Sequence, residues 1–130
     1  MSRVCTADKF QLMLTEMLED SENTTAEQMR KACRASAAKG RREVKSNIDK
    51  SEIKQWTGKY NAGWATSTKA NGNQRYSATI YNKTMPGLAH LLEKGHAKVG
   101  GGRVKGIKHI EPAAEVAFED FEKRLEAIRL

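Results

Sequence analysis

The feature that most constrains the fold is a pair of alternating segments on either side of the dipeptide Asn71-Gly72. A period of two residues is typical of a strand with one buried face, and Asn-Gly suits the tight turn between antiparallel strands. Both segments are rich in Thr, Tyr and Ile, which favour strands. The sequence therefore predicts a β-hairpin, whose alternating positions are Trp64, Thr66, Thr68, Tyr76, Ala78 and Ile80.

A long amphipathic helix is predicted before the hairpin, from about Ala26 to about Ile48, with Thr25 and Gln28 spaced as a capping box. The buried stripe of this helix is narrow and its centre is small, so a neighbouring helix or sheet can approach closely. Glycine at position 40 costs about 1 kcal/mol against alanine in a helix interior, and close packing would explain its presence. The stripe consists of Met29, Cys33, Ala37, Gly40, Val44 and Ile48.

Two more helices are predicted after the hairpin. A short one runs from Leu88 to Lys94 and ends at Gly95, because glycine permits a left-handed turn at a helix end. The last helix begins near Pro112, since proline suits the first helical turn. Its apolar face consists of Ala113, Ala117, Phe121, Leu125 and Ile128.

The remaining segments are predicted from weaker patterns. Residues 7–20 are interpreted as a short amphipathic helix, residues 54–64 as a loop, and residues 98–106 as a flexible basic loop. Ile107 and Ile110 flank a short extended piece. The helical face within residues 7–20 consists of Phe10, Met13, Leu14, Met17 and Leu18.

This order of elements is typical of the α+β class. We expect a long N-terminal helix and a C-terminal helix packed on a small antiparallel sheet that contains the hairpin. The 130 residues suffice for one domain spanning residues 1–130, with a short helix in residues 1–22.

Composition narrows the function classes. The hydrophobic fraction is 38%, and no run approaches the roughly 18 apolar residues of a membrane-spanning helix. The first residues lack the apolar core of a signal peptide. Cys5 and Cys33 are too few for a disulfide framework or a cysteine-based zinc site, and Cys33 falls on the apolar face of its helix. We therefore expect a protein that stays in a cytoplasm and contacts no membrane.

The net charge of +7 is distributed unevenly. Residues 30–59 hold ten bases and three acids, and residues 94–110 hold five bases and no acid. Residues 1–29 hold six acids and two bases, and residues 111–130 hold six acids and three bases. A basic field attracts polyanions, and the same asymmetry lets copies of one chain attract each other head to tail. Charge alone leaves both interpretations open.

A metal site is the first chemical interpretation of the segment HLLEKGH, which contains His90, Glu93 and His96. A helical zinc pair uses histidines four residues apart, whereas these are six apart. His109 follows only after the predicted loop, so we interpret His90 and His109 as surface or half-buried polar contacts. The sequence predicts no metal site.

Catalysis is also disfavoured. No GxSxG motif is present, neither cysteine has a recognisable setting, and Glu93 is the only acid between Glu52 and Glu111. The segment GGGRVKG does not match a phosphate-binding loop. We predict no catalytic residue and no cofactor.

Nucleic-acid binding has more support, because the long helix and the basic loop both carry many bases. Aromatic residues make up only 6% of the chain, which leaves little surface for base stacking, and no helix-turn-helix, zinc-finger or RNP pattern is present. Any binding of this kind would contact the backbone with little sequence specificity.

Two segments considered together resemble a known family. They are WTGKYNAGWATS and YNKTMPGLAHLLEKGHAKVGGGRVKGIKHIEPAAE, within a resemblance that covers about residues 26–129. Their order and spacing are similar to those of the tail-completion, or head–tail joining, proteins of long-tailed bacteriophages. That family has a long helix, a TG…GW segment, a hairpin, an asparagine near a strand end, a helix of the AHLLExGH type, a variable loop and a PA before the last helix. Here His109-Ile110-Glu111 precedes Pro112-Ala113, where the family usually has an apolar or aromatic pair.

The resemblance implies a structural protein of the virion, located at the neck or tail and assembled in the host cytoplasm. Its partners would be copies of itself in a ring, for which a hexamer is one candidate size, and neighbouring neck, connector or tail proteins. Contact with genomic DNA in the channel would be nonspecific. The alternative is a nonspecific nucleic-acid-binding protein of a mobile element, with an enzyme the least favoured class.

Within this resemblance, Glu93 is structural and accepts hydrogen bonds from nearby backbone or from the basic loop, and His96 is a polar contact. Trp64 is a folding residue buried against the long helix. The structural motif as a whole comprises Gly58, Trp64, Glu93, Gly95, His96 and Pro112. The loop bases expected to face a partner or DNA are Lys98, Arg103, Lys105 and Lys108.

Overall fold

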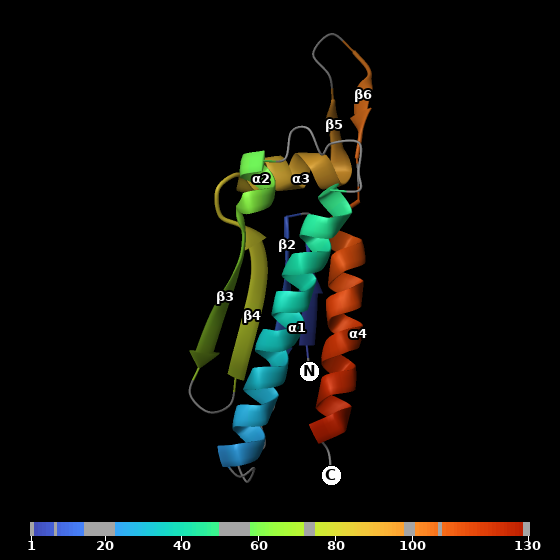
Figure 1. Ribbon diagram of the computed structural model, residues 1–130. Coiled ribbons are helices and arrows are strands. Elements are labelled where there is room, and N and C mark those ends of the chain that lie inside the picture. Colours follow the sequence, from blue (N-terminus) through green and yellow to red (C-terminus); the bar gives the residue numbers. More distant parts are fainter. Residues whose placement is uncertain are drawn as a thin grey trace.

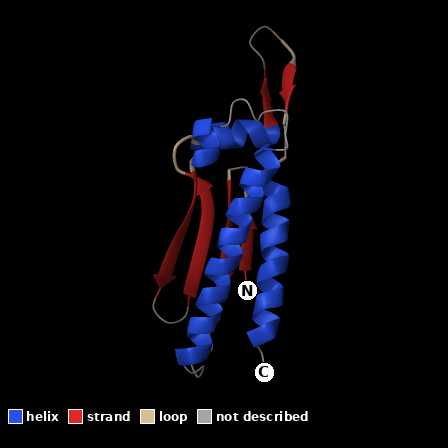
Figure 2. Cartoon of the chain, in the orientation of Figure 1, coloured by secondary structure: helices blue, strands red, loops and turns tan. Residues whose placement is uncertain are grey.

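The protein consists of one four-stranded antiparallel sheet with two long helices over one of its faces (Figure 1; Figure 2). This computed structural model describes residues 2–6, 8–14, 23–49, 58–71, 75–97, 101–106 and 108–128. The strands of the sheet are β1 (Ser2–Cys5), β2 (Lys9–Leu14), β3 (Trp64–Asn71) and β4 (Arg75–Asn82), in the order β1-β2-β4-β3. The long helices are α1 (Asn23–Asp49) and α4 (Ile110–Ile128). The predicted α+β class is confirmed.

Two short helices and a small hairpin lie at one end of these layers (Figure 1). The helices are α2 (Gly58–Ala62) and α3 (Pro86–Lys94), and the hairpin pairs β5 (Gly95–Ala97) with β6 (Arg103–Lys105). The hairpin projects beyond α3, away from the sheet and the long helices (Figure 1). Among the described helices, none combines the length and apolar character needed to cross a membrane.

The predicted hairpin is confirmed: β3 pairs with β4 from Trp64↔Asn82 to Asn71↔Arg75, and its turn, residues 72–74, lies outside the described residues. The buried alternation continues through β4 at Tyr76, Ala78 and Ile80. Among the described side chains of β3, Trp64 alone is buried, whereas Thr66 and Thr68 are exposed. The alternation therefore identified the face correctly but not how far the helices cover it.

The predicted helix over residues 7–20 is wrong. Residues Lys9–Leu14 form β2, which pairs with β1 on one side and β4 on the other. The segment FQLML fits both the helical period and the strand period. Phe10, Met13 and Leu14 have the spacing of a helix face, whereas Phe10, Leu12 and Leu14 alternate as the buried residues of a strand. Pairing with β4 selects the strand over the helix. Strand β1 was not predicted, because residues 2–5 carry no alternating or helical pattern. Residues 15–22 lie outside the described part of the chain.

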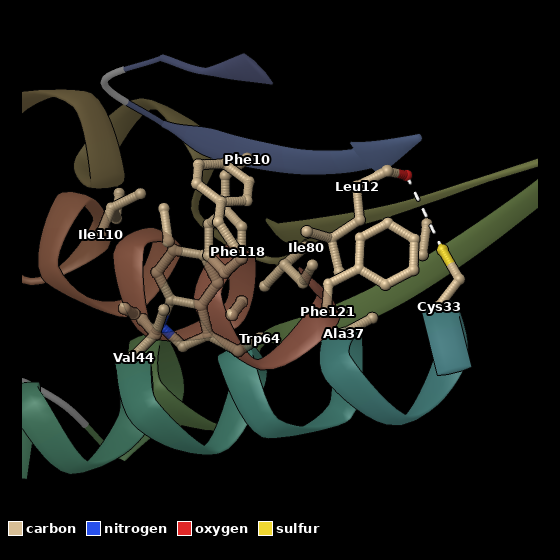
Figure 3. Packing of buried hydrophobic residues seen from close by; sticks show 14 of the residues in the cluster. Phe10, Leu12, Cys33, Ala37, Val44, Trp64, Ile80, Ile110, Phe118 and Phe121 are labelled. Atoms are coloured by element: carbon tan, nitrogen blue, oxygen red, sulfur yellow. Dashed lines mark hydrogen bonds between the residues drawn. The ribbon is translucent and has the colours of Figure 1, made fainter. Parts of the chain in front are cut away.

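The buried stripe of α1 is confirmed, including Cys33, Ala37, Val44 and Ile48 (Figure 3). A Cβ atom on Gly40 would lie 2.8 Å from Phe10 Cζ and 3.0 Å from Ala117 Cβ. Glycine at this position therefore lets α1 approach both β2 and α4, which is the close packing that the small residues predicted.

Helix α4 completes the core (Figure 3). Ala113, Ala117 and Phe121 are buried as predicted, and Leu125 and Ile128 are partly buried against the same cluster. The prediction missed three buried residues of this helix, namely Ile110, Ala114 and Phe118. The Phe118 ring contacts Phe10 edge to face, with 6.2 Å between ring centroids, so α4 packs directly on β2.

Three connecting segments differ from prediction. The supposed loop at 98–106 contains strand β6, the supposed loop at 54–64 contains helix α2, and Ile110 begins α4 instead of flanking an extended piece. Ile107 and residues 98–100 lie outside the described residues. Both ends of the hairpin lie at the carboxyl end of α3: β5 begins at Gly95, and a Cβ on Gly106 would lie only 2.6 Å from the Glu93 carbonyl oxygen.

Candidate functional site

Glu93 of α3 caps the amino end of α4. Its Oε1 accepts hydrogen bonds from the backbone N–H groups of His109 at 2.8 Å and Ile110 at 2.9 Å, and Oε2 accepts from Glu111 at 3.0 Å. The first N–H groups of a helix have no partner within the helix, and a carboxylate there also interacts favourably with the helix dipole. The prediction that Glu93 accepts backbone hydrogen bonds is confirmed.

His109 extends this contact into the core. Its Nδ1 lies 3.0 Å from Glu93 Oε1 and its Nε2 lies 2.7 Å from the Tyr60 hydroxyl. His109 is fully buried, so its interpretation as a surface or half-buried contact is wrong. Because a carboxylate only accepts hydrogen bonds, Nδ1 carries the proton, and in the neutral ring Nε2 accepts from the Tyr60 hydroxyl.

The charges of this cluster follow from its hydrogen bonds. Burial alone would raise the pKa of Glu93, but the hydrogen bonds from the His109 ring and three backbone N–H groups outweigh it and lower the pKa to about 2. Burial, with the Glu93 charge as a smaller cause, raises the pKa of Tyr60. Glu93 is therefore ionised and Tyr60 keeps its hydroxyl proton near neutral pH.

A carboxylate, a histidine and a hydroxyl in sequence are also the parts of a nucleophilic triad. Tyr60 and His109 are both fully buried, so the hydroxyl is not accessible to a substrate in this packing. Their rings instead contact Trp64, at centroid distances of 5.7 Å from Tyr60 and 6.2 Å from His109. The cluster thus joins α2, α3, α4 and the start of β3 into one structural unit.

Asn82 makes the second buried polar joint, at the end of β4. Its Nδ2 donates to the Tyr60 carbonyl oxygen at 2.6 Å, and its Oδ1 accepts from the N–H of Met85 at 2.9 Å and of Thr84 at 3.2 Å. A Cβ on Gly63 would overlap Thr84 Oγ1 and lie 2.7 Å from Asn82 Oδ1, so a larger residue there would displace the side chains of this joint. The joint fixes the loop from β4 into α3 beside the carboxyl end of α2.

Sequence reasoning missed the buried roles of Tyr60, Asn82 and His109 in these joints. The family pattern supplied only an asparagine near a strand end. For Asn82 a signal existed, because the alternation of Tyr76, Ala78 and Ile80 continues onto it and places an amide on the buried face. No local pattern marks Tyr60, since its partners are 22 and 49 residues away along the chain.

The other predicted structural residues are placed as follows. Trp64 is buried against α1, where Arg41 Nε donates to its carbonyl oxygen at 2.7 Å. Gly95 has φ 81° and ends α3 as predicted, although its ψ of 179° is extended and leads directly into β5. Gly58 is the first residue of α2, and Pro112 lies in the first turn of α4. The side chain of His96 lies outside the described residues.

The four predicted partner-facing bases are not seen as a cluster. Arg103 and Lys105 are strand residues of β6, but their side chains, like Lys98 as a whole, lie outside the described part of the structure. Lys108 forms an ion pair with Glu111 at 3.3 Å, so its nearest acid is in its own chain. Among the described residues, no group of three His, Cys, Asp or Glu side chains is placed to hold a metal ion.

Comparison with protein families identifies a family for most of the chain. The family model described as "Bacteriophage HK97-gp10, putative tail-component" matches residues 8–95. The match extends from β2 to the first residue of β5, and it includes the Asn82 joint and the capping residue Glu93. Neither the curated proteins nor the solved structures contain a significant match to the chain.

Proposed function

Because the chain belongs to the HK97-gp10-like family of bacteriophage tail components, we propose that it is a tail-completion subunit, which forms a ring where the tail joins the head. As a tail component, it is a structural protein of the virion. The finer proposal adds self-assembly into a ring, in the host cytoplasm, and contact with neighbouring neck, connector or tail proteins.

The observation that supports a joining role is a projecting hairpin on a fixed base. Strand β5 starts directly after α3, and β6 leads through Lys108 to His109, so both legs of the hairpin meet at the Glu93–His109 contact. Glu93 binds three backbone N–H groups there, which fixes the base to the core. We call this hairpin, formed by β5 and β6, the arm. A short basic arm on a fixed base suits contact with a neighbouring protein or nucleic acid.

The arm makes a testable distinction between its two candidate partners. If it contacts an acidic protein surface, Arg103→Glu with Lys105→Glu blocks joining of heads to tails without changing DNA affinity. If it contacts DNA, the same variant assembles, and the slope of log affinity against log salt falls by about 0.9 for each lost phosphate contact on duplex DNA. Lys123→Glu, an exposed change on α4, is the matched control.

The experiment that tests the function is complementation. A phage or prophage that encodes this chain is deleted for it and supplied with wild-type or variant protein, and particles are examined by electron microscopy. We expect the deletion to give unjoined heads and tails, and the wild-type chain to restore infectious particles that contain it. Infectious particles from the deletion strain, or purified virions without the chain, would refute the proposal.

The basic character of α1 and of the arm also favours nonspecific nucleic-acid binding as an alternative. Helix α1 contains seven Lys and Arg residues and three acids. Under this alternative, the purified chain binds duplex DNA of any sequence with a steep salt dependence and is absent from virions.

A further inference from the structure

The sheet has two open edges among the described residues. There β1 pairs only with β2, and β3 pairs only with β4, so each of these outer strands has one side without a described backbone partner. The N–H and C=O groups of an edge strand can pair with another strand. A partner that supplies strands of its own would fit either edge.

The flank of α1 beside β3 is basic. Arg41 donates to the Trp64 carbonyl of β3, and Arg34 donates to the Tyr76 hydroxyl of β4 at 3.3 Å, which shows that this side of α1 faces those strands. Lys45 is four residues beyond Arg41 on the same side, and Arg42 is exposed next to it. We call these residues, Arg34, Arg41, Arg42 and Lys45, the basic flank.

The flank of α4 beside β1 is acidic. Glu111 and Glu115 line one hollow together with Cys5 and Thr6 at the end of β1. Lys94 and Lys108 also line it, and Lys108 pairs with Glu111. Within the described part of the chain, the unpaired acidic charge on this flank therefore comes from Glu115 and Glu119. Glu115 and Glu119 are exposed and have no ion pair among the described residues. We call Glu111, Glu115 and Glu119 the acidic flank; α4 as a whole has six acids and two bases.

The two flanks lie at the same level of the molecule. Asn47 near the carboxyl end of α1 donates to the His109 carbonyl just before α4, at 3.2 Å. Arg42 and Lys45 are therefore near the same end of the helix pair as Glu115. The basic flank lies beside β3 and the acidic flank beside β1, which are the two outer strands of the sheet.

The strand directions allow a second copy, shifted sideways without rotation, to pair its β1 with β3 of the first copy. Each neighbouring pair in the order β1-β2-β4-β3 is antiparallel, so β1 and β3 run in opposite directions. A second copy placed beside the first in the same orientation brings its β1 antiparallel to β3 of the first. The same placement brings its acidic flank against the basic flank of the first copy.

We propose that this chain assembles head to tail by pairing β3 of one copy with β1 of the next, with the basic flank of the first against the acidic flank of the second. The inference rests on the proposed ring and specifies its contact surface. The contact is heterologous, and a constant rotation from copy to copy closes such a chain into a ring. A second copy is the favoured occupant because one chain carries both complementary edges and both complementary flanks.

The register within the sheet predicts which residues meet. Cys5 pairs with Phe10, Phe10 with Ile80, and Ile80 with Thr66, so Cys5 and Thr66 lie at the same level on opposite edges. Without stagger, Thr66 of one copy faces Cys5 of the next, and a shift of two residues places Thr68 opposite that cysteine. Within one copy three strand spacings, about 14 Å, separate Cys5 from Thr66, which is too far for a disulfide.

This geometry gives a cross-linking experiment on the full chain. Thr66→Cys and Thr68→Cys are oxidised mildly in separate samples and resolved by non-reducing electrophoresis. We expect one of them to give a ladder of covalent oligomers through Cys5, which ends at the size of the ring. Ser67→Cys points to the other sheet face and should give no ladder, and adding Cys5→Ser should abolish the ladder.

Charge reversal provides the second measurement, by native mass spectrometry. Arg42→Glu with Lys45→Glu, and separately Glu115→Lys with Glu119→Lys, should each lose the oligomer, since like charges then meet. Mixing the two reversed proteins should restore oligomers, because each supplies the flank that the other needs.

The outcomes separate this inference from the proposed function. If rings form but neither cysteine variant cross-links and neither reversal weakens them, the contact is wrong while the joining role stands. If the wild-type chain stays monomeric at all concentrations, the contact is also wrong. Absence of the chain from virions would instead refute the joining role.

Discussion

Replacement of Glu93 tests how much the buried cluster of Glu93, His109 and Tyr60 contributes to the stability of the fold. Glu93→Gln keeps the size of the side chain and one acceptor oxygen, but it removes the charge and places an amide against N–H groups. The wild-type carboxylate receives four hydrogen bonds, three from backbone N–H groups and one from the His109 ring. The variant therefore separates the role of the charge from that of the shape.

The pKa of Glu93 gives the size of the effect. It is lowered from 4.5 to about 2 in the folded chain, and one pKa unit corresponds to about 1.4 kcal/mol. The ionised form thus stabilises the fold by about 3 kcal/mol. Since the folded-state pKa is depressed, this contribution is fully present above about pH 4.5 and is lost as the pH falls towards 2.

The assay is denaturant unfolding followed by circular dichroism at several pH values. At pH 7 we expect Glu93→Gln to lower the free energy of unfolding by about 3 kcal/mol, and Glu93→Ala by roughly as much or more, because it leaves buried N–H groups unpaired. Between pH 4.5 and 2 the wild-type chain should lose stability more steeply than Glu93→Gln. Glu126→Gln, at an exposed acid of α4 outside the acidic flank, should stay within about 0.5 kcal/mol of the wild type.

A result that contradicts this account is easy to recognise. If Glu93→Gln has wild-type stability at pH 7 and an unchanged dependence on pH, the carboxylate does not cap α4 as an ion. If purified wild-type protein instead contains an equivalent of zinc that is lost in Glu93→Gln, the cluster is a metal site and the structural assignment is wrong.

Three further predictions concern the core. Trp64→Ala should cost about 3–5 kcal/mol of stability, and an unchanged melting temperature would show that the tryptophan is not a folding residue. Gly40→Ala should destabilise by about 1–3 kcal/mol despite the better helix propensity of alanine, because the new Cβ would lie 2.8 Å from Phe10 Cζ; equal or higher stability would show that α1 has room to move. Burial raises the pKa of the Cys33 thiol to about 12, so a maleimide should label Cys5 and spare Cys33 in the folded chain, and equal labelling of both would contradict the packing.

The elements that sequence reasoning predicted correctly are those with one dominant local pattern. The hairpin has the dipeptide Asn-Gly between two alternating segments, and α1 repeats apolar or small residues at helical spacing from Met29 to Ile48. Residues 9–14 carry two compatible patterns, and only the pairing with β4 selects the strand. Local pattern fails where the deciding partner is distant along the chain.

The candidate site shows the same division. Glu93 was identifiable as a lone acid among bases and glycines next to a helix stop, and its role as a backbone acceptor was predicted together with the family resemblance. His109 was misassigned because its burial depends on Tyr60, Trp64 and Glu93, which come from three other elements. A histidine in a polar segment carries no local sign of such an enclosure.

The error at the N-terminus also bears on function. If residues 7–20 had formed a helix, the sheet would lack β2 and β1, and β4 would be an outer strand with no acidic flank beside it. The actual strands place an open edge next to α4, level with the basic flank on the other side of the molecule. Sequence alone left the charge asymmetry open between nucleic-acid binding and self-association. The structure favours self-association, because the acidic flank lies beside the outer strand β1 and the basic flank beside the outer strand β3, and these two strands run in opposite directions. Cross-linking from Thr66 to Cys5 of the next copy tests self-association most directly, since an adsorbed nucleic acid cannot produce a ladder of covalent protein oligomers that depends on which face of β3 carries the cysteine.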